Sequence, residues 1–193
     1  IGADGKLILD SSNNVYQVNL LEKLLVTLLC RLGNLVIDGG IWMNTQRPEW
    51  NDANNALVGQ GLSMVTLCYL RRYVAFLEDL LAGETRPVTL SIEVSQWLSE
   101  TTSALAAIRP LLGGERISTG QRFETLAKLG QASSRYRQAI YRPEPFSGSE
   151  KVSLEPIRAM LDNALAAIDH SIKTNRREDG LYHAYNLLNV QGD

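Results

Sequence analysis

The sequence predicts an all-α fold made of antiparallel helical hairpins. Apolar residues recur with helical spacing over long stretches of the 193-residue chain. Glycine, proline and asparagine separate these stretches, and long segments of strand-like alternation are missing. Helices of about 20 residues span about 30 Å, so consecutive helices joined by short turns are expected to pack side by side in opposite directions. We expect residues 1–193 to form a single domain or a fragment of a larger one.

The first two helices are expected to be central because their apolar faces are wide. After an opening loop or brief strand, one helix runs from about Val15 to Leu32, with an N-cap among residues 12–14 and Gly33-Asn34 at its end. The second covers Leu62 to Leu81, and its broad apolar side is expected to comprise Leu62, Val65, Tyr69, Tyr73, Phe76, Leu77 and Leu80. Cys30 and Cys68 fall within these helices and are interpreted as small buried side chains.

Three further helices follow at short intervals. They are expected over residues 91–112, 118–141 and 154–174. Ser118 followed by Gln121 forms a capping-box pattern, and Ser153 is a candidate N-cap for the last of the three. The segment 181–190 is expected to begin another short helix or strand.

Composition excludes several classes of function. The formal net charge is -2, the pI is near 5.8, and basic tracts are missing, so neither nucleic acid nor an anionic membrane is an expected partner. Apolar runs stay below the roughly 18 residues of a membrane span, and a secretory signal is not recognisable. Two cysteines within apolar helical patterns suit a reducing cytoplasm and do not indicate a disulfide framework. Neither histidine has a spacing that suits a metal site with these cysteines. The sequence implies no cofactor.

The segment 44–55 carries the most distinctive chemistry. It places two carboxylates, an arginine, a tryptophan and four asparagines between two apolar helical runs. If such side chains were buried away from water, their amides and charges would lack partners. A carboxylic acid, amides and a flat aromatic ring together suit a polyhydroxylated ligand such as a sugar. The alternative is an ordered loop held by Asx-turns and a tryptophan anchor.

Two segments resemble a known enzyme family. Trp50-Asn51-Asp52-x-x-Asn55, within residues 47–59, resembles the Trp-Asn-Asp motif of glycoside phosphorylases of the cellobiose and chitobiose type. The sequence of residues 47–59 is similar to large bacterial proteins described as cellobiose-phosphorylase-like. A second segment is similar to another stretch of the same proteins: Arg177-Glu178-Asp179-Gly180-Leu181-Tyr182-His183-Ala184-Tyr185-Asn186. The resemblance implies an (α/α)6 toroid whose remainder lies in a longer parent chain, consistent with the cut-looking ends at Ile1 and Asp193. Glu49 stands where the family usually has aspartate, and phosphate-binding residues cannot be matched.

The resemblance also implies a role for Asp52, and the chemistry of the other polar and aromatic residues suggests theirs. Asp52 would be the general acid that protonates the leaving oxygen, and Glu49 would raise its pKa or activate water. An oligosaccharide would be the substrate, with inorganic phosphate as the attacking group if the enzyme is a phosphorylase. Candidate substrate contacts are Trp42, Arg47, Trp50, Asn51, Asn54, Asn55, Tyr182 and His183.

Structural explanations compete with each of these roles. Asp52 could cap a turn, Glu49 could pair with Arg47, and both tryptophans could be buried anchors. The alternative at the level of function is a non-catalytic helical domain that binds a sugar or a protein partner through the 44–55 loop. A third possibility is a purely structural helical bundle.

Overall fold

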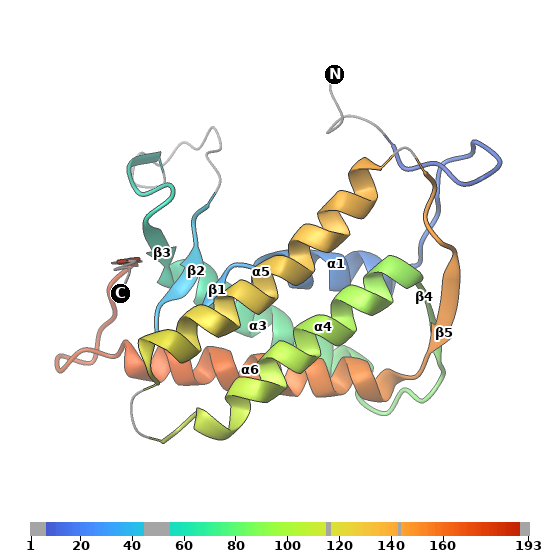
Figure 1. Ribbon diagram of the computed structural model, residues 1–193. Coiled ribbons are helices and arrows are strands. Elements are labelled where there is room, and N and C mark those ends of the chain that lie inside the picture. The colour runs from blue at the N-terminus through green and yellow to red at the C-terminus, as the bar shows by residue number, and fades with distance from the viewer. Residues whose placement is uncertain (1–6, 45–54, 115–116, 143, 190–193) are drawn as a thin grey trace.

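The computed structural model describes residues 7–44, 55–114, 117–142 and 144–189. The fold is mixed α/β, with 57% of the chain helical and 12% in strands, and it contains a four-stranded antiparallel sheet and a two-stranded sheet (Figure 1). The prediction of an all-α fold of helical hairpins, and with it of part of an (α/α)6 toroid, is therefore wrong. The helices dominate the mass, and the sheets lie at opposite ends of them.

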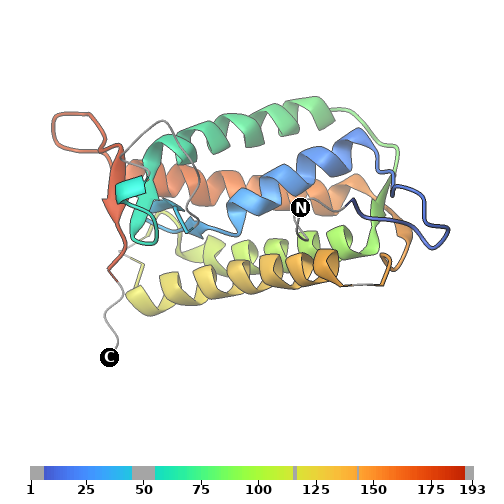
Figure 2. The ribbon, with the colours of Figure 1, turned by 90° about the horizontal axis from the view of Figure 1, so that it is seen from above.

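Five long helices make up the core of the described chain. They are α1 (Leu20–Leu32), α3 (Met64–Leu81), α4 (Ile92–Ile108), α5 (Thr119–Tyr141) and α6 (Leu154–Thr174). The pairs α4–α5 and α3–α6 each run antiparallel, and α1 packs against helices of both pairs (Figure 2). Fully buried leucines from several helices meet between them, among them Leu25, Leu29, Leu67, Leu98, Leu129 and Leu161. Hence one continuous apolar core joins both halves of the chain.

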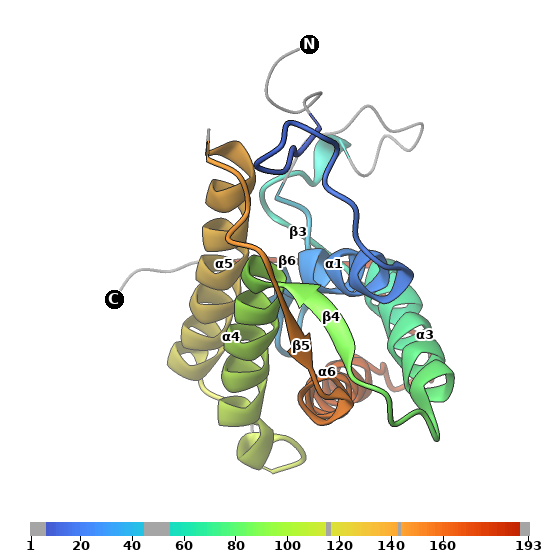
Figure 3. The ribbon, with the colours of Figure 1, turned by 90° about the vertical axis from the view of Figure 1, so that its right-hand side faces the viewer.

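The four-stranded sheet has the order β1-β2-β3-β6. Its strands are β1 (Leu35–Val36), β2 (Gly40–Trp42), β3 (Gly61–Ser63) and β6 (Tyr185–Leu187). All neighbours are antiparallel, with Ile41 opposite Ser63 and Leu62 opposite Asn186. The second sheet pairs β4 (Val88–Ser91) with β5 (Ser149–Val152) at the other end of the helices (Figure 3).

The sequence did not predict these strands because each is only two to four residues long. A period of two residues needs a longer run to be recognised. β5 is also polar and mostly exposed, so it carries no apolar alternation at all. Pairing partners far apart in the chain, rather than local pattern, define these strands. The segment 181–190, left open between helix and strand, contains β6.

Local caps set several helix boundaries. Ser118 and Gln121 form the predicted capping box at the start of α5, and the bounds expected for α5 and α6 are confirmed within a residue. The first helix begins later than predicted, at Leu20, because the side chain of Asn19 accepts a hydrogen bond from the Glu22 amide. The third predicted helix ends at Ile108, and a 3-10 turn, η2 (Arg109–Leu111), contains Pro110.

Two predictions of burial are wrong. Cys30 and Cys68 are both exposed. In α3 the buried side is Met64, Leu67, Leu70, Val74, Leu77 and Leu81, whereas Val65, Tyr69, Phe76 and Leu80 are about half exposed or more. Apolar residues occur on most sides of this helix, so periodicity alone did not identify the face that packs against α6. Among the described helices, none is both long and apolar enough to cross a membrane.

Candidate functional site at the four-stranded sheet

The connection from β2 to β3 carries the polar segment predicted to bind a ligand. Hydrogen bonds close its base, from the Met43 amide to the Gly61 carbonyl at 2.9 Å and from the Gly59 amide to the Met43 carbonyl at 2.6 Å. The indole N–H of Trp42 donates to the Gly59 carbonyl at 3.0 Å. The amide of Asn44 donates to Asn34 Oδ1, just after α1, at 2.6 Å. Both ends of the connection are therefore fixed to the sheet and to the end of α1.

Most of the predicted site lies outside the described residues. This applies to both proposed catalytic groups, Asp52 and Glu49, and to Arg47, Trp50, Asn51 and Asn54. Of the predicted contacts within the connection, Asn55 is exposed at the start of a helical turn, and Trp42 is half-buried at the end of β2. The Trp42 indole nitrogen is already engaged, so a ligand contact at this residue would have to use the ring.

Tyr182 and His183 lie in the segment that leads into β6. Both are exposed. In the register of β6, Tyr185 pairs with Ser63 and Leu187 pairs with Gly61. The β2–β3 connection rejoins the sheet at Gly61. Tyr182 and His183 precede Tyr185, which pairs with Ser63 at the other end of β3, about 7 Å from Gly61 along the strand. The sheet thus joins β3, which follows the β2–β3 connection, to β6, which contains Tyr185 and Asn186.

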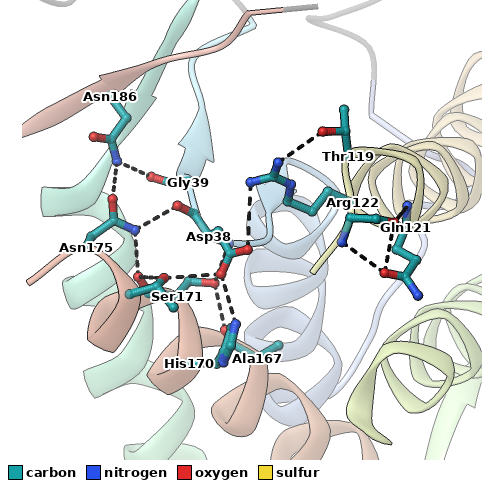
Figure 4. A network of polar contacts seen from close by, with 12 residues as sticks. Asp38, Gly39, Thr119, Gln121, Arg122, Ala167, His170, Ser171, Asn175 and Asn186 are labelled. Carbon is teal, nitrogen blue, oxygen red and sulfur yellow. Dashed lines mark hydrogen bonds and ion pairs between the residues drawn. The ribbon is translucent and has the colours of Figure 1, made fainter. Parts of the chain in front are cut away.

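A polar cluster that sequence reasoning missed surrounds Asp38, in the turn between β1 and β2 (Figure 4). Asp38 has a φ of 64°, in the left-handed region that aspartate tolerates better than most residues. Its carboxylate accepts a hydrogen bond from Thr174 Oγ1 at 3.2 Å and lies 3.7 Å from the guanidinium of Arg122. With 12% of its side chain exposed, Asp38 has neighbours from both α5 and α6.

His170 completes this cluster. Its Nδ1 accepts a hydrogen bond from the Gly113 amide at 3.2 Å, which assigns the proton of the neutral ring to Nε2. Nε2 lies 2.9 Å from Asp38 Oδ1, although the direction of the contact does not meet the requirements of a hydrogen bond. The contact is therefore an ion-pair contact if the imidazole is protonated, and a poorly aligned polar contact if it is neutral.

Backbone groups of the same turn are held as firmly as the carboxylate. The Asp38 amide donates to Ser171 Oγ at 3.1 Å, and the Asn175 side chain donates to the Asp38 carbonyl at 2.8 Å. Asn186 of β6 donates to the Gly39 carbonyl at 2.7 Å and to Asn175 Oδ1 at 2.8 Å. These bonds tie the β1–β2 turn to α6 and β6, so the cluster positions the sheet and leaves Asp38 little capacity for a ligand.

The sequence contained a partial signal for this cluster. Asp38-Gly39-Gly40 marked a sharp turn, and Gly40 has a φ of 138° with the carbonyl of Ser63 only 3.1 Å from where a Cβ would be. The partners of Asp38 lie more than 80 residues further along the chain, so local pattern could not reveal them. Within the described residues there is no group of three or more metal-ligating side chains.

Comparisons with models of known protein families and with curated proteins give no match. The likeness to glycoside phosphorylases therefore rests on the residues of this sequence alone. The described structure adds how the two ends of the β2–β3 connection are held by hydrogen bonds to the sheet and to Asn34 after α1.

Proposed function

We propose that this chain belongs to a cytoplasmic carbohydrate-active enzyme that cleaves or phosphorolyses glycosidic bonds, with Asp52 as the general acid. The observation that carries the proposal is the closed base of the β2–β3 connection, formed by Trp42, Met43, Gly59 and Gly61. A loop that is fixed at both ends on a rigid scaffold is a common arrangement for binding and catalytic residues. The polar residues of 44–55 supply the sugar-binding chemistry on that scaffold.

The proposed reaction needs one proton donor and one nucleophile. Asp52 would deliver a proton to the glycosidic oxygen as the bond to the sugar carbon breaks. In hydrolysis, Glu49 would take a proton from the attacking water. In phosphorolysis, inorganic phosphate would attack the sugar carbon directly and Asp52 alone would suffice. Asn51, Asn54 and Asn55 are suited to the sugar hydroxyls, and Trp50 or the ring of Trp42 to a sugar face.

A second candidate function is non-catalytic binding through the same loop. The composition of residues 44–55 suits it as well, because amides and an aromatic ring bind a ligand without any proton transfer. Under this alternative the 44–55 segment binds a sugar or a protein partner without turnover.

One experiment separates the two candidates. Binding of cello- and manno-oligosaccharides is measured by calorimetry with and without phosphate, and sugar or sugar-phosphate release is followed in parallel. Asp52→Asn should lower turnover by about 100-fold or more while oligosaccharide affinity stays within a few-fold. Asp79→Asn, at an exposed site on α3, is the matched control and should change neither quantity.

Each result has a definite meaning. Turnover that Asp52→Asn abolishes supports the enzyme, and a requirement for phosphate assigns phosphorolysis. Binding without turnover in the wild-type chain supports the non-catalytic alternative. Neither heat nor product with any oligosaccharide contradicts the enzyme and the binding of a sugar, and it favours a protein partner or a purely structural role for the loop.

A further inference from the structure

His170 of α6 is a titratable side chain that contacts two connecting segments, the β1–β2 turn (Figure 4) and the α4–α5 connection (the described residues 112–114, between η2 and α5). Only 10% of its side chain is exposed. Its Nδ1 accepts the hydrogen bond from the Gly113 amide at 3.2 Å, and its Nε2 lies 2.9 Å from Asp38 Oδ1. Nε2 is buried and has no aligned hydrogen-bond acceptor among the described residues. One imidazole therefore lies between two segments that belong to different halves of the chain.

The two ring nitrogens cannot both keep these contacts when the imidazole changes charge. In the neutral ring one nitrogen donates and the other accepts, so Nδ1 accepts from Gly113 only while the proton is on Nε2. The protonated ring carries a hydrogen on both nitrogens. Nδ1 would then face the amide hydrogen of Gly113 with a hydrogen of its own, and this bond would be lost. Nε2 keeps its hydrogen and gains a positive charge beside the Asp38 carboxylate, so protonation strengthens that contact.

Charged groups from the surrounding elements act on the ring in different ways. Asp38 of the β1–β2 turn attracts the charge of a protonated ring. Arg122 of α5 repels it, but lies 3.7 Å from Oδ2 of Asp38 and so leaves Oδ1 to His170. The other charged groups on η2 and near His170 on α6 are paired elsewhere or exposed: Arg109 pairs with Asp162, Asp169 pairs with Arg71, and Lys173 is exposed. The protonated ring therefore has one charged partner, the Asp38 carboxylate.

The two segments differ in how much they depend on the imidazole. The β1–β2 turn has further bonds to α6, from the Asp38 amide to Ser171 Oγ and from the Asn175 side chain to the Asp38 carbonyl. It therefore stays on α6 in both charge states of the ring. For the α4–α5 connection, the bond from Gly113 to His170 is the only hydrogen bond between the described residues 112–114 and a long helix or strand. Protonation of His170 therefore acts mainly on this connection.

We propose that His170 makes the attachment of the α4–α5 connection to α6 dependent on pH. The neutral ring holds Gly113 against α6, and the protonated ring releases Gly113 and pairs with Asp38. Gly113 has a φ of 81° and is followed by a second glycine, so the released backbone has conformations open to it that most residues resist. This inference does not depend on the function proposed for the 44–55 loop.

The test follows the wild-type 193-residue chain by NMR over about pH 5–8, the interval in which histidine commonly changes charge. The ring nitrogen shifts of His170 should show a proton on Nε2 at the upper end and on both nitrogens at the lower end. The Gly113 amide resonance should move with the same midpoint. Its hydrogen exchange should accelerate about fivefold or more at the lower end, after correction for the intrinsic rate. The Asp38 amide should stay protected, because it donates to Ser171 in both states.

Variants assign the effect to this ring. His170→Gln keeps a polar side chain that does not titrate, so the Gly113 amide should no longer respond to pH in this interval. His183→Gln, at the exposed second histidine, is the matched control and should leave the Gly113 response unchanged. Asp38→Asn removes the charged partner of the protonated ring, so His170 should titrate at lower pH. Asparagine also tolerates the φ of 64° at this position.

Three results would overturn the proposal. They are a Gly113 amide that does not move with the His170 ring, a His170 ring that keeps one charge state throughout the interval, and a folded His170→Gln chain with the wild-type Gly113 response. The first two are measured on the wild-type chain, so they decide the matter even if substitutions at this junction prevent folding.

Discussion

At the scale of single residues, a buried carboxylate links the start of α1 to the start of α4. Glu22 is only 3% exposed and accepts hydrogen bonds from both the amide and the hydroxyl of Ser91. In the sequence it merely interrupts an apolar run, because its partner lies 69 residues away. Glu22 thereby holds the N-cap residue of α4 in place, and Ser91 makes no side-chain capping bond to its own helix.

Glu22→Ala is expected to destabilise the fold by about 1–3 kcal/mol, because it leaves the buried amide of Ser91 unpaired and its hydroxyl with Tyr16 as its remaining side-chain partner. Glu22→Gln keeps one oxygen acceptor and should cost less. Urea denaturation followed by circular dichroism measures both. Glu178→Ala, at an exposed position, should stay within about 0.5 kcal/mol of the wild type. Equal stability of Glu22→Ala and this control would contradict the role of Glu22.

At the scale of elements, a glycine permits the close approach of α1 and α5. Gly33 follows α1 with a φ of -59°, so it is not needed for a left-handed cap. A Cβ at this position would lie 2.0 Å from Ser133 Oγ and 2.9 Å from Ser133 Cβ. The sequence suggested Gly33 as a helix terminator, but the structure gives it a packing role that depends on a residue 100 positions later.

Gly33→Ala should therefore cost about 1–3 kcal/mol through overpacking. Ser133→Gly in the same chain should recover part of that loss, although glycine within α5 carries its own cost of about 1 kcal/mol. The coupling is read from a double-mutant cycle in urea. Gly120→Ala, with open space around it in α5, is the control and should be neutral or stabilising. Additive effects of the two changes would exclude the contact.

At the scale of the whole molecule, β6 fastens the end of the described chain to its first half. It pairs with β3, and the Met64 amide at the start of α3 donates to the Ala184 carbonyl at 3.0 Å. Asn186 adds the bonds to the β1–β2 turn and to Asn175. The base of the polar connection therefore depends on a strand more than 120 residues later.

A chain ending at Arg176 should keep its helical circular dichroism but lose order in the sheet. It retains Asn175 and lacks β6, so hydrogen exchange at the Met64 amide should accelerate at least tenfold while the amides of α4 stay protected. A chain ending at Asn189 serves as the control and should exchange like the wild type. Unchanged protection of Met64 after removal of β6 would show that the sheet does not need this strand.

The candidate sites were predictable only in part. The sequence identified the polar segment 44–55 by its composition, and Trp42 and Asn55 at its borders. It did not reveal the Asp38 turn as a junction, because Arg122, His170 and Thr174 reach it from two distant helices.

The sequence by itself determined the long helices and several of their ends. Helical periodicity and capping act over three to four residues, so α5, α6 and the box at Ser118 follow from local chemistry. The tertiary structure decided the sheets, the exposed side of α3 and the partners of Glu22 and Asp38. Strands of two to four residues gain their stability from hydrogen bonds to distant strands, and a helix with apolar residues on most of its sides is oriented by its neighbours. These hydrogen bonds and packing contacts exist only after the chain has folded.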